Sequence, residues 1–271
     1  MDNNKNCSEI NNSPLISIIT VVLNGEDVLE ETILSVIKQT YQNIQYIVVD
    51  GNSKDNTVNI IKKFNRSIDQ WISKDDHGIY DAMNTGASMA KGDLIGFLNA
   101  GDTLFPETIY DLALGFQEKN FDYSFGSIVV EDKFGRKLGI NEPVDDINQN
   151  NFFIMPMPSP HMGVYMKKNL FHKLNGYDLK FSLSADYDLL LRSINLSKKV
   201  WFFKSPVGTF KVGGVSGSFK THLENYMVHR KHSVAFFKRL FLLAHSMLRA
   251  FVSSLFFDRT VYKIKLFFNL K

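Results

Sequence analysis

The chain has 271 residues, of which 44% are hydrophobic, enough for one sizeable core or for a core with a small appended unit. Its 31 Lys and Arg and 28 Asp and Glu leave a net charge of only +3, which argues against a protein that binds nucleic acid through its overall charge. The single cysteine, Cys7, excludes an internal disulfide and fits a reducing compartment. We see no signal peptide and no uninterrupted run of about 18 apolar residues, so we expect no membrane span.

Strands and helices are predicted to alternate along the first half of the chain. Residues 1–13 are polar, and we expect them to be disordered. Leu15–Leu23 is a continuous β-branched run, typical of a strand buried on both faces. Further strands are predicted over residues 45–49, 69–73, 94–98 and 123–130, and helices over 26–39, 57–64, 79–90 and 107–118. This alternation predicts an α/β fold with a mostly parallel central sheet and helices on both faces.

The pattern changes after Glu131, where mixed sheet and loops are expected to extend the first half. We predict a hairpin turn over residues 132–136 and a loop-rich segment over 141–160. A strand over 161–166 and helices over 168–174 and 186–194 are expected next. Another strand is predicted over 200–203, followed by a glycine-rich segment over 208–217. Residues 14–218 are therefore expected to form one domain with halves at 14–130 and 131–218. Residues 219–271 are expected to form a helical tail.

Three carboxylates occupy positions where chemistry is plausible. Asp50 directly follows a predicted strand, where it could accept hydrogen bonds from a nucleoside or form an Asx turn or helix cap. Asp102 follows a buried strand and Asn-Ala-Gly, and its hard oxygens suit Mg²⁺ or Mn²⁺, although it could also cap the next helix. Asp186 begins a helix, where it could deprotonate a hydroxyl or act as an N-cap.

Several motifs occur in an order that is similar to a known family. They are Ser17–Thr20, Asp50-Gly51-Asn52-Ser53 with Asp55 and Thr57, then Gly78, Asp81, Asn84, Gly86, Ala90, Gly92 and Asp93, and finally Phe97-Leu98-Asn99-Ala100-Gly101-Asp102. Together they closely resemble the family-2 glycosyltransferases of the GT-A fold, most of all the small bacterial enzymes that build capsule, O-antigen and exopolysaccharide. The resemblance covers roughly Leu15 to Ser216. No zinc-binding pattern, P-loop, dinucleotide-binding motif or hydrolase nucleophile motif points elsewhere.

The resemblance implies roles for individual residues. Asp50 would contact the nucleoside of a sugar donor, and the nucleotide pocket would be lined by Asn52, Asp75, Asp76, Asp81, Asn84, Asn99, Ala100 and Gly101. Asp102 would bind a divalent cation, Mn²⁺ or Mg²⁺, together with the donor diphosphate. Asp186 would be the general base that activates the acceptor hydroxyl.

The chain departs from the family pattern in three places. Asn99 and Gly101 stand where acidic residues are usual, Ala185 stands where a glutamate usually precedes the base, and the Gln-x-x-Arg-Trp motif of processive synthases is absent. The resemblance therefore implies transfer of one sugar without polymerisation.

The implied enzyme is a nonprocessive, inverting hexosyltransferase, and it has two alternatives. It would move a sugar from a nucleotide-sugar donor, in most relatives UDP-linked, to a lipid-linked glycan, without a nucleic-acid partner. Residues 14–130 would bind the donor and 131–218 the acceptor. One alternative is a sugar nucleotidyltransferase, whose glycine-rich, basic first loop is replaced here by Asn24-Gly25-Glu26. The other is an inactive module that only binds nucleotide sugars.

The tail is basic and aromatic. Over Val234–Phe257, one helical arc is apolar and the opposite arc is basic, interrupted by Leu242 and Leu243. The apolar arc contains Phe236, Phe237, Leu240, Phe241, Ala244, Met247, Leu248, Phe251 and Leu255; the basic arc contains Lys238, Arg239, His245 and Arg249. A second aromatic segment, Tyr262–Leu270, follows. The composition favours a helix that lies on an anionic membrane, with a cytoplasmic protein held peripherally on its inner face. A helix packed on the core and a homodimer interface are the alternatives.

Overall fold

The first half of the fold consists of four parallel strands joined by helices. The computed structural model describes residues 13–132, 134–143, 160–211 and 219–255. The strands are β1 (Ile16–Val22), β2 (Ile44–Asp50), β3 (Gln70–Ser73) and β4 (Leu94–Asn99), and the helices are α1 (Leu29–Ile37), α2 (Thr57–Lys63) and α3 (Ile79–Met89). Each neighbouring pair of strands is parallel, in the order β3-β2-β1-β4. β1 is buried along its whole length, which explains its continuous apolar sequence.

The second half continues the same sheet with mainly antiparallel pairs. Its elements are β5 (Thr103–Leu104), α4 (Thr108–Lys119), β6 (Tyr123–Glu131), β7 (Lys137–Asn141), the 3₁₀ helix η1 (His161–Gly163), β8 (Val164–Lys167), α6 (Lys168–Lys173), α7 (Ala185–Leu196) and β9 (Val200–Lys211). The nine strands have the order β3-β2-β1-β4-β8-β6-β9-β5, with β7 paired to β6. β8 is antiparallel to β4 and β6, whereas β9 is parallel to β6. The sheet is thus parallel in the first half and mixed in the second.

Two predicted strands differ from the structure by three or more residues at one end, and the others by one residue. The first three residues of the predicted strand 161–166 form η1, and only the rest belongs to β8. β9 continues to Lys211 instead of ending at Phe203, because register shifts opposite Ser127 accommodate Pro206, which has no N–H to donate to the ladder. Most of the loop predicted over residues 141–160, the glycine-rich segment from 212 onward, residues 1–12 and Tyr262–Leu270 lie outside the described residues.

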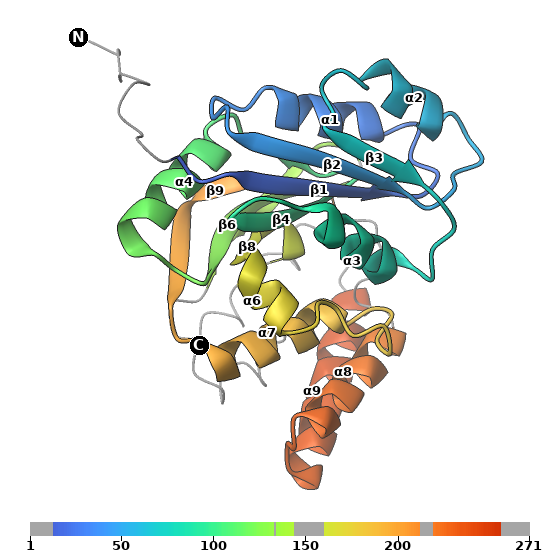
Figure 1. The fold of residues 1–271 in the computed structure, drawn as a ribbon. Coiled ribbons are helices and arrows are strands. Elements are labelled where there is room, and N and C mark those ends of the chain that lie inside the picture. The colour runs from blue at the N-terminus through green and yellow to red at the C-terminus, as the bar shows by residue number, and fades with distance from the viewer. Residues whose placement is uncertain (1–12, 133, 144–159, 212–218, 256–271) are drawn as a thin grey trace.

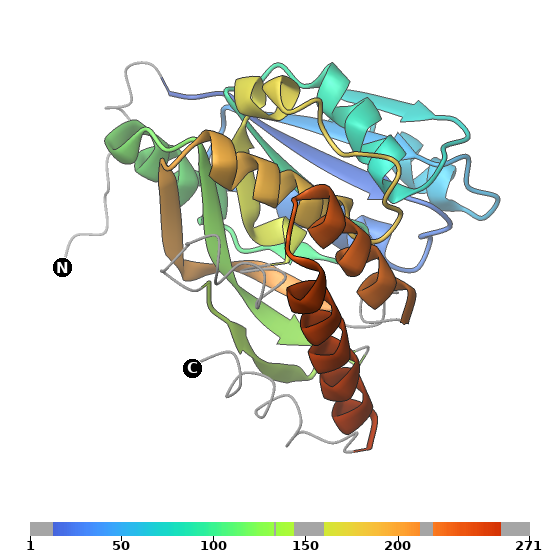
Figure 2. The same cartoon turned by 90° about the horizontal axis from the view of Figure 1, so that it is seen from below.

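The helices divide the core into two layers, one on each face of the sheet (Figures 1 and 2). Ile19 and Val21 of β1 pack towards α3, α6 and α7. Ile18 and Val22, on the other face, pack towards α1, α2 and α4. This alternation follows from the two-residue period of a strand. It places α7, which carries Asp186, on the same face as α3.

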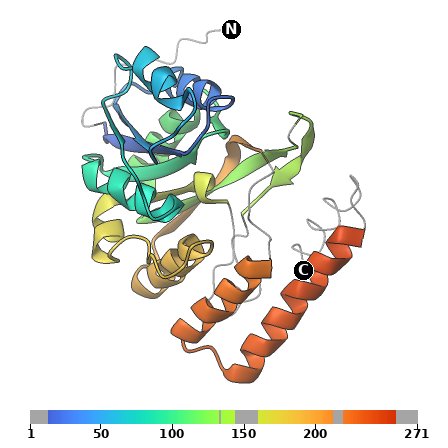
Figure 3. The ribbon, with the colours of Figure 1, turned by 90° about the vertical axis from the view of Figure 1, so that its right-hand side faces the viewer.

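The C-terminal residues form two helices, α8 (Phe219–Lys231) and α9 (Phe236–Leu255). They make a helical hairpin that projects from the α/β domain (Figure 3). Val228 of α8 is fully buried in the same core layer as α7, and His229 Nε2 lies 2.9 Å from the Tyr187 hydroxyl. α9 packs against α8. Among the described helices, none has both the length and the apolar content needed to cross a bilayer.

A buried ion cluster also joins α8 to α7. Asp188 is fully buried, and its carboxylate contacts Arg192 Nε at 2.8 Å, Lys231 Nζ at 2.8 Å and His232 Nε2 at 3.0 Å. Burial alone would raise the pKa of Asp188, but hydrogen bonds from His232 and Lys231 and the neighbouring positive charges lower it to about 2. Lys231 also contacts Asp178 at 2.9 Å. α8 is therefore held on the α/β domain by charge as well as by apolar packing.

Candidate active site

The carboxyl ends of the four parallel strands lie level with one another. In the sheet register, Asp50 at the end of β2 is beside Val22 of β1 and Ser73 of β3. Asn99 at the end of β4 is beside Val21. The loops that follow these strands, which carry most of the predicted site residues, therefore leave the same edge of the sheet. This is the edge at which open α/β sheets bind ligands.

Asp50 organises the loop that follows β2. Its carboxylate is fully buried and accepts hydrogen bonds from the Ser53 N–H at 3.1 Å, the Ser53 hydroxyl at 2.5 Å and the Ser73 hydroxyl at 2.6 Å. The same loop contacts the loop after β1, because the Ser53 hydroxyl accepts the Asn24 N–H at 2.8 Å. Asp50 thus forms the predicted turn. Its contact with a nucleoside stays a prediction.

The loop before α3 and the first turn of α3 carry three further predicted residues. Asp75 Oδ1 accepts the Asn52 side-chain amide at 2.8 Å, which joins this loop to the one after β2. Asp76 accepts the Gly78 N–H at 2.8 Å, and Asp81 accepts the His77 N–H at 3.0 Å. These bonds turn the chain sharply into α3 and leave Asp75 exposed. A side chain at Gly51 would place its Cβ only 2.5 Å from Asp76 Oδ2, so a larger residue there would require the Asp76 side chain to move.

Asn84 lies further along α3 and holds a different part of the chain. Its Nδ2 donates to the Tyr177 carbonyl and its Oδ1 accepts the Tyr177 N–H, both at 2.9 Å. The two bonds fix the loop between α6 and α7 against α3. Both polar ends of the amide are therefore engaged with backbone, and the predicted contact of Asn84 with a nucleotide would have to displace one of these bonds or be made through the loop.

Asp102 is a buried carboxyl group with few compensating contacts. It is 4% exposed, and its Oδ1 accepts a 3.3 Å hydrogen bond from the Lys211 N–H at the end of β9. Burial raises the pKa of Asp102 to about 7. The hydrogen bond from the Lys211 N–H and the positive charge of Lys211 lower this pKa by less than burial raises it. Gly101, which has a φ of +101°, donates its N–H to Thr32 Oγ1 at 2.9 Å, and Ala100 N–H donates to the Val21 carbonyl at 3.2 Å. The turn from β4 to Asp102 is thus tied to β1 and α1.

The residues around Asp102 fit a divalent cation that is shared with a substrate. Asn99 Oδ1 is buried and has no hydrogen-bond partner among the described residues. A carboxylate and an amide oxygen are donors that Mg²⁺ and Mn²⁺ accept. The described ranges contain no group of three or more His, Cys, Asp or Glu side chains that could hold a metal ion. The remaining ligands would therefore be phosphate oxygens and water, as is common for Mg²⁺.

Asp186 is the second residue of α7 and faces the start of α3. Tyr80, in the first turn of α3, is buried, and its hydroxyl interacts electrostatically with the Asp186 carboxylate. The Tyr177 ring, 5.0 Å from that of Tyr80, also lies in the field of this carboxylate. Loss of water around the carboxyl group raises the pKa of Asp186, and the Tyr80 hydroxyl and the Tyr187 N–H oppose this effect. The arrangement is that of a carboxylate whose basicity is raised by its surroundings.

A family model for Glycosyl transferase family 2 matches residues 17–172, more than half of the chain. The chain belongs to glycosyltransferase family 2. An uncharacterized glycosyltransferase of Mycobacterium tuberculosis strain CDC 1551 is 32% identical to it over 187 residues, which cover 67% of this chain and 69% of the relative. A PGL/p-HBAD biosynthesis glycosyltransferase of Mycobacterium bovis strain BCG Pasteur 1173P2 is 29% identical over 186 residues, which cover 66% of this chain and 70% of the relative.

Solved structures confirm the GT-A fold of this glycosyltransferase. Staphylococcus aureus TarS 1–349 in complex with UDP superposes with a TM-score of 0.64 at 16% identity, covering 88% of this chain and 72% of that one. The mannosyltransferase PcManGT of Pyrobaculum calidifontis, in complex with GDP-Man and Mn²⁺, gives 0.60 at 12% identity, covering 88% and 75%. A longer TarS chain gives 0.63 at 15% identity; the match covers 86% of this chain but only 42% of that one.

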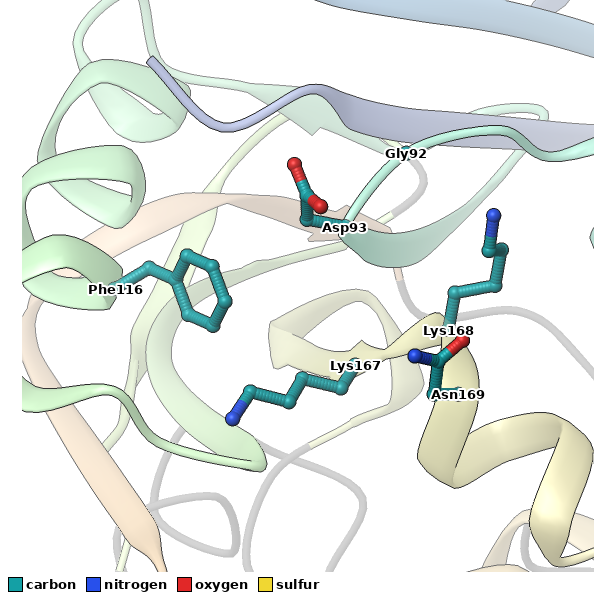
Figure 4. Close-up of a pocket in the computed structure, with 6 residues that line it drawn as sticks. All are labelled: Gly92, Asp93, Phe116, Lys167, Lys168 and Asn169. Carbon is teal, nitrogen blue, oxygen red and sulfur yellow. The ribbon is translucent and has the colours of Figure 1, made fainter. Parts of the chain in front are cut away.

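The glycosyltransferase fold brings together residues that the sequence did not connect. Tyr80 and Tyr177 interact electrostatically with Asp186, and Lys211 contacts Asp102, although none of the three was predicted to belong to the site. A different pocket, of about 320 Å³, is lined by Gly92, Asp93, Phe116, Lys167, Lys168 and Asn169 (Figure 4). It lies where β4 begins and β8 ends, so it opens at the opposite edge of the sheet from Asp50 and Asn99. Its Lys167 ammonium is already paired with Asp122 at 2.9 Å.

Proposed function

We propose that this glycosyltransferase moves one hexose, with inversion, from a UDP-linked donor to a lipid-linked glycan during the synthesis of a bacterial surface polysaccharide. The observation that carries the proposal is the packing of α7 in the same core layer as α3, with the Asp186 carboxylate in electrostatic contact with the Tyr80 hydroxyl. Tyr80 follows the loop at the carboxyl end of β3, so this packing brings the candidate base to the edge where Asp50 and Asn99 end their strands. A donor-binding edge and a base on one side of the sheet are what a single displacement requires.

In the proposed reaction, Asp186 accepts the proton of the acceptor hydroxyl while the hydroxyl oxygen attacks the anomeric carbon. The bond between that carbon and the diphosphate oxygen breaks at the same time, so an α-linked donor gives a β-glycoside. A Mn²⁺ or Mg²⁺ ion held by Asp102 and Asn99 would supply positive charge for the leaving diphosphate. The loops around Asp50, Asn52, Asp75 and Asp81 would hold the nucleoside.

The choice of donor and acceptor draws on relatives. TarS has been crystallised with UDP and with UDP-GlcNAc, and PcManGT with GDP-Man and Mn²⁺, which supports a nucleotide-sugar donor and favours UDP. A relative named for PGL/p-HBAD biosynthesis supports a lipid-linked acceptor. The absence of the Gln-x-x-Arg-Trp motif supports transfer of a single sugar.

A panel of nucleotide sugars tests the donor. We expect UDP-sugars, with Mn²⁺ present, to raise the melting temperature by several degrees, because a ligand at about 100 times its Kd stabilises the folded state by about 2.7 kcal/mol. The stabilising UDP-sugar should then release UDP on incubation, while GDP- and dTDP-sugars should do neither. Stabilisation by GDP-sugars alone would contradict the choice of UDP. Binding without any sugar transfer or UDP release would instead indicate an inactive binding module, and pyrophosphate exchange would indicate a nucleotidyltransferase.

We also propose that the hairpin of α8 and α9 lies on an anionic membrane surface. Phe237 is 83% exposed and Phe241 is 67% exposed, and Leu240 and Leu248 on the same face are exposed as well. Leu242, which interrupts the basic arc, is buried against the rest of the protein. No acidic residue occurs between Glu224 and Asp258, whereas Lys238, Arg239 and Arg249 flank the apolar face in sequence. An exposed aromatic stripe beside basic residues suits the interface of an anionic bilayer.

Vesicle flotation tests this surface. We expect the full chain to float with phosphatidylglycerol vesicles more than with neutral phosphatidylcholine vesicles, and to lose much of that binding in high salt. A chain ending at Lys231 and the double variant Phe237→Ser/Phe241→Ser should float poorly. Phe134→Ser is the matched control, since it removes an exposed phenylalanine from the turn between β6 and β7. Equal flotation of all variants would contradict the proposal, and a dimer that the double substitution dissociates would assign the face to a homodimer.

A further inference from the structure

The serine at the N-cap of the helix that carries Asp186 does not cap it, although Asp186 itself accepts the Tyr187 N–H at 2.8 Å. Ser184 is the N-cap of α7, but its side chain makes no capping hydrogen bond. Its hydroxyl oxygen is buried and has no hydrogen-bond partner among the described residues. A serine in this position ordinarily accepts an N–H of the first turn. The Ser184 side chain therefore does not fix the segment that leads into α7.

Glu224 of α8 holds this segment from forty residues away in the chain. Its Oε2 accepts the N–H of Leu183 at 2.7 Å and the N–H of Ser184 at 3.1 Å, and its Oε1 accepts the Ser182 hydroxyl at 2.7 Å. The carboxylate is 7% exposed. It is also the only acidic residue between positions 219 and 255, in a segment that is otherwise basic and apolar. Charge-assisted hydrogen bonds of this kind are short and strong, so they fix the segment 182–184 relative to α8.

We propose that Glu224 is a positioning residue for the Asp186 base, and that α8 is consequently part of the catalytic unit. Asp186 comes two residues after Ser184, so the bonds from Glu224 determine where the base enters the site. α8 can serve as a fixed support because Val228 is buried in the core and Lys231 contacts Asp188 and Asp178. The inference rests on the proposed function for the role of Asp186 as base.

Glu224 also acts on Asp186 through its charge. The Asp186 carboxyl group interacts electrostatically with Tyr80 of α3, Tyr177 of the loop after α6 and Glu224 of α8. Burial raises the pKa of Asp186, the Tyr80 hydroxyl lowers it, and the negative charge of Glu224 raises it further. A base with a raised pKa accepts a proton more readily near neutral pH. Glu224 would thus both place the base and strengthen it.

Glu224→Gln tests the proposal, because glutamine keeps the size and an acceptor oxygen but removes the charge. We expect kcat for UDP release from the turned-over UDP-sugar to fall on the order of 10- to 100-fold, the range of a misplaced catalytic group. The acid limb of the kcat–pH profile should move to lower pH, because loss of the neighbouring negative charge lowers the pKa of Asp186. The Kd for UDP should be unchanged. Glu118→Gln, on the exposed surface of α4, is the matched control and should change neither kcat nor the profile.

Several results would overturn the inference. One is a Glu224→Gln protein with wild-type kcat and an unmoved acid limb. Another is a lower kcat that is explained by weaker UDP binding and less folded protein, with the acid limb of the kcat–pH profile unmoved. If Glu224→Gln does not fold, Glu224→Asp is the test: a lower kcat with the limb retained supports the inference, and wild-type kcat overturns it. Failure of the wild-type chain to turn over any nucleotide sugar would instead contradict the proposed function.

Discussion

Replacing Asp186 by asparagine should abolish most turnover while leaving donor binding intact. Asparagine has the same size but cannot accept the proton of the acceptor hydroxyl, and general-base catalysis contributes about 10²- to 10⁴-fold to a rate. We therefore expect kcat for UDP release to fall by about that factor, with the Kd for UDP within a few-fold of wild type. In the wild type, activity should fall as pH decreases through the raised pKa of Asp186, above the usual range of an aspartate.

Glu118→Gln provides the control for Asp186→Asn. Glu118 lies on the exposed surface of α4, so this substitution also converts a carboxylate to an amide but leaves Tyr80 and the contacts of α8 unchanged. It should retain turnover. Wild-type turnover in Asp186→Asn would show that the base is another residue. Equal losses in the two variants would show that the effect of Asp186→Asn is on folding.

Replacing Asp102 by asparagine should remove the cation-dependent part of UDP binding. In the wild type, protons and the cation compete for this carboxylate, whose pKa burial raises to about 7. UDP binding in Mn²⁺ should consequently be about tenfold weaker at pH 6 than at pH 8, because one pH unit below the pKa about nine-tenths of the group is protonated. In Asp102→Asn this pH dependence should be absent. Calorimetric titration at the two pH values measures it, and wild-type Mn²⁺ dependence in the variant would contradict the assignment.

Asp102→Asn, which should weaken UDP binding, should raise the stability of the fold at high pH. The folded pKa of Asp102 lies above its unfolded value near 3.8, so the fold favours the protonated form. This contribution to stability is complete below the unfolded pKa and is lost as pH rises through about 7. Without divalent cations at pH 8, Asp102→Asn should therefore be more stable than wild type, by up to about 4 kcal/mol at about 1.36 kcal/mol per pKa unit. Urea unfolding at pH 8 measures the difference. A variant less stable than wild type at this pH would contradict the burial of a charged Asp102.

The first half of the fold was predictable because its signals are local. Strands buried on both faces have continuous β-branched sequences, and each amphipathic helix between them has its own periodicity. For the observed order β3-β2-β1-β4, right-handed crossover connections then place α1 and α2 on one face of the sheet and α3 on the other. The second half was less predictable, because β9 pairs with residues of β6 about 80 positions away and with residues of β5 about 105 positions away.

The site was predictable where a residue's role depends on its own strand or helix. Asp50 and Asp102 follow buried strands and Asp186 begins a helix, and each of these positions can be read from the sequence. Glu224 could not be found in this way. The side of α8 that packs on the domain includes Glu224 and His229 as well as Val228, so its buried face has no apolar periodicity. Only the three-dimensional contact with residues 182–184 reveals what this carboxylate does.

The pairing of β9 with β5 beside Asp102 determines the smallest fragment of the chain that could be active. At Gly208 of β9 an added Cβ would lie 2.0 Å from the Thr103 carbonyl, so β9 and β5 meet at the tightest glycine contact of the described chain. This contact brings the end of β9 over Asp102. A fragment cut to the region shared across the family, residues 17–172, would therefore leave that carboxyl group open to water, with an ordinary acidity, and would also lack Asp186. The region that defines the family by sequence is smaller than the unit that could carry out its chemistry.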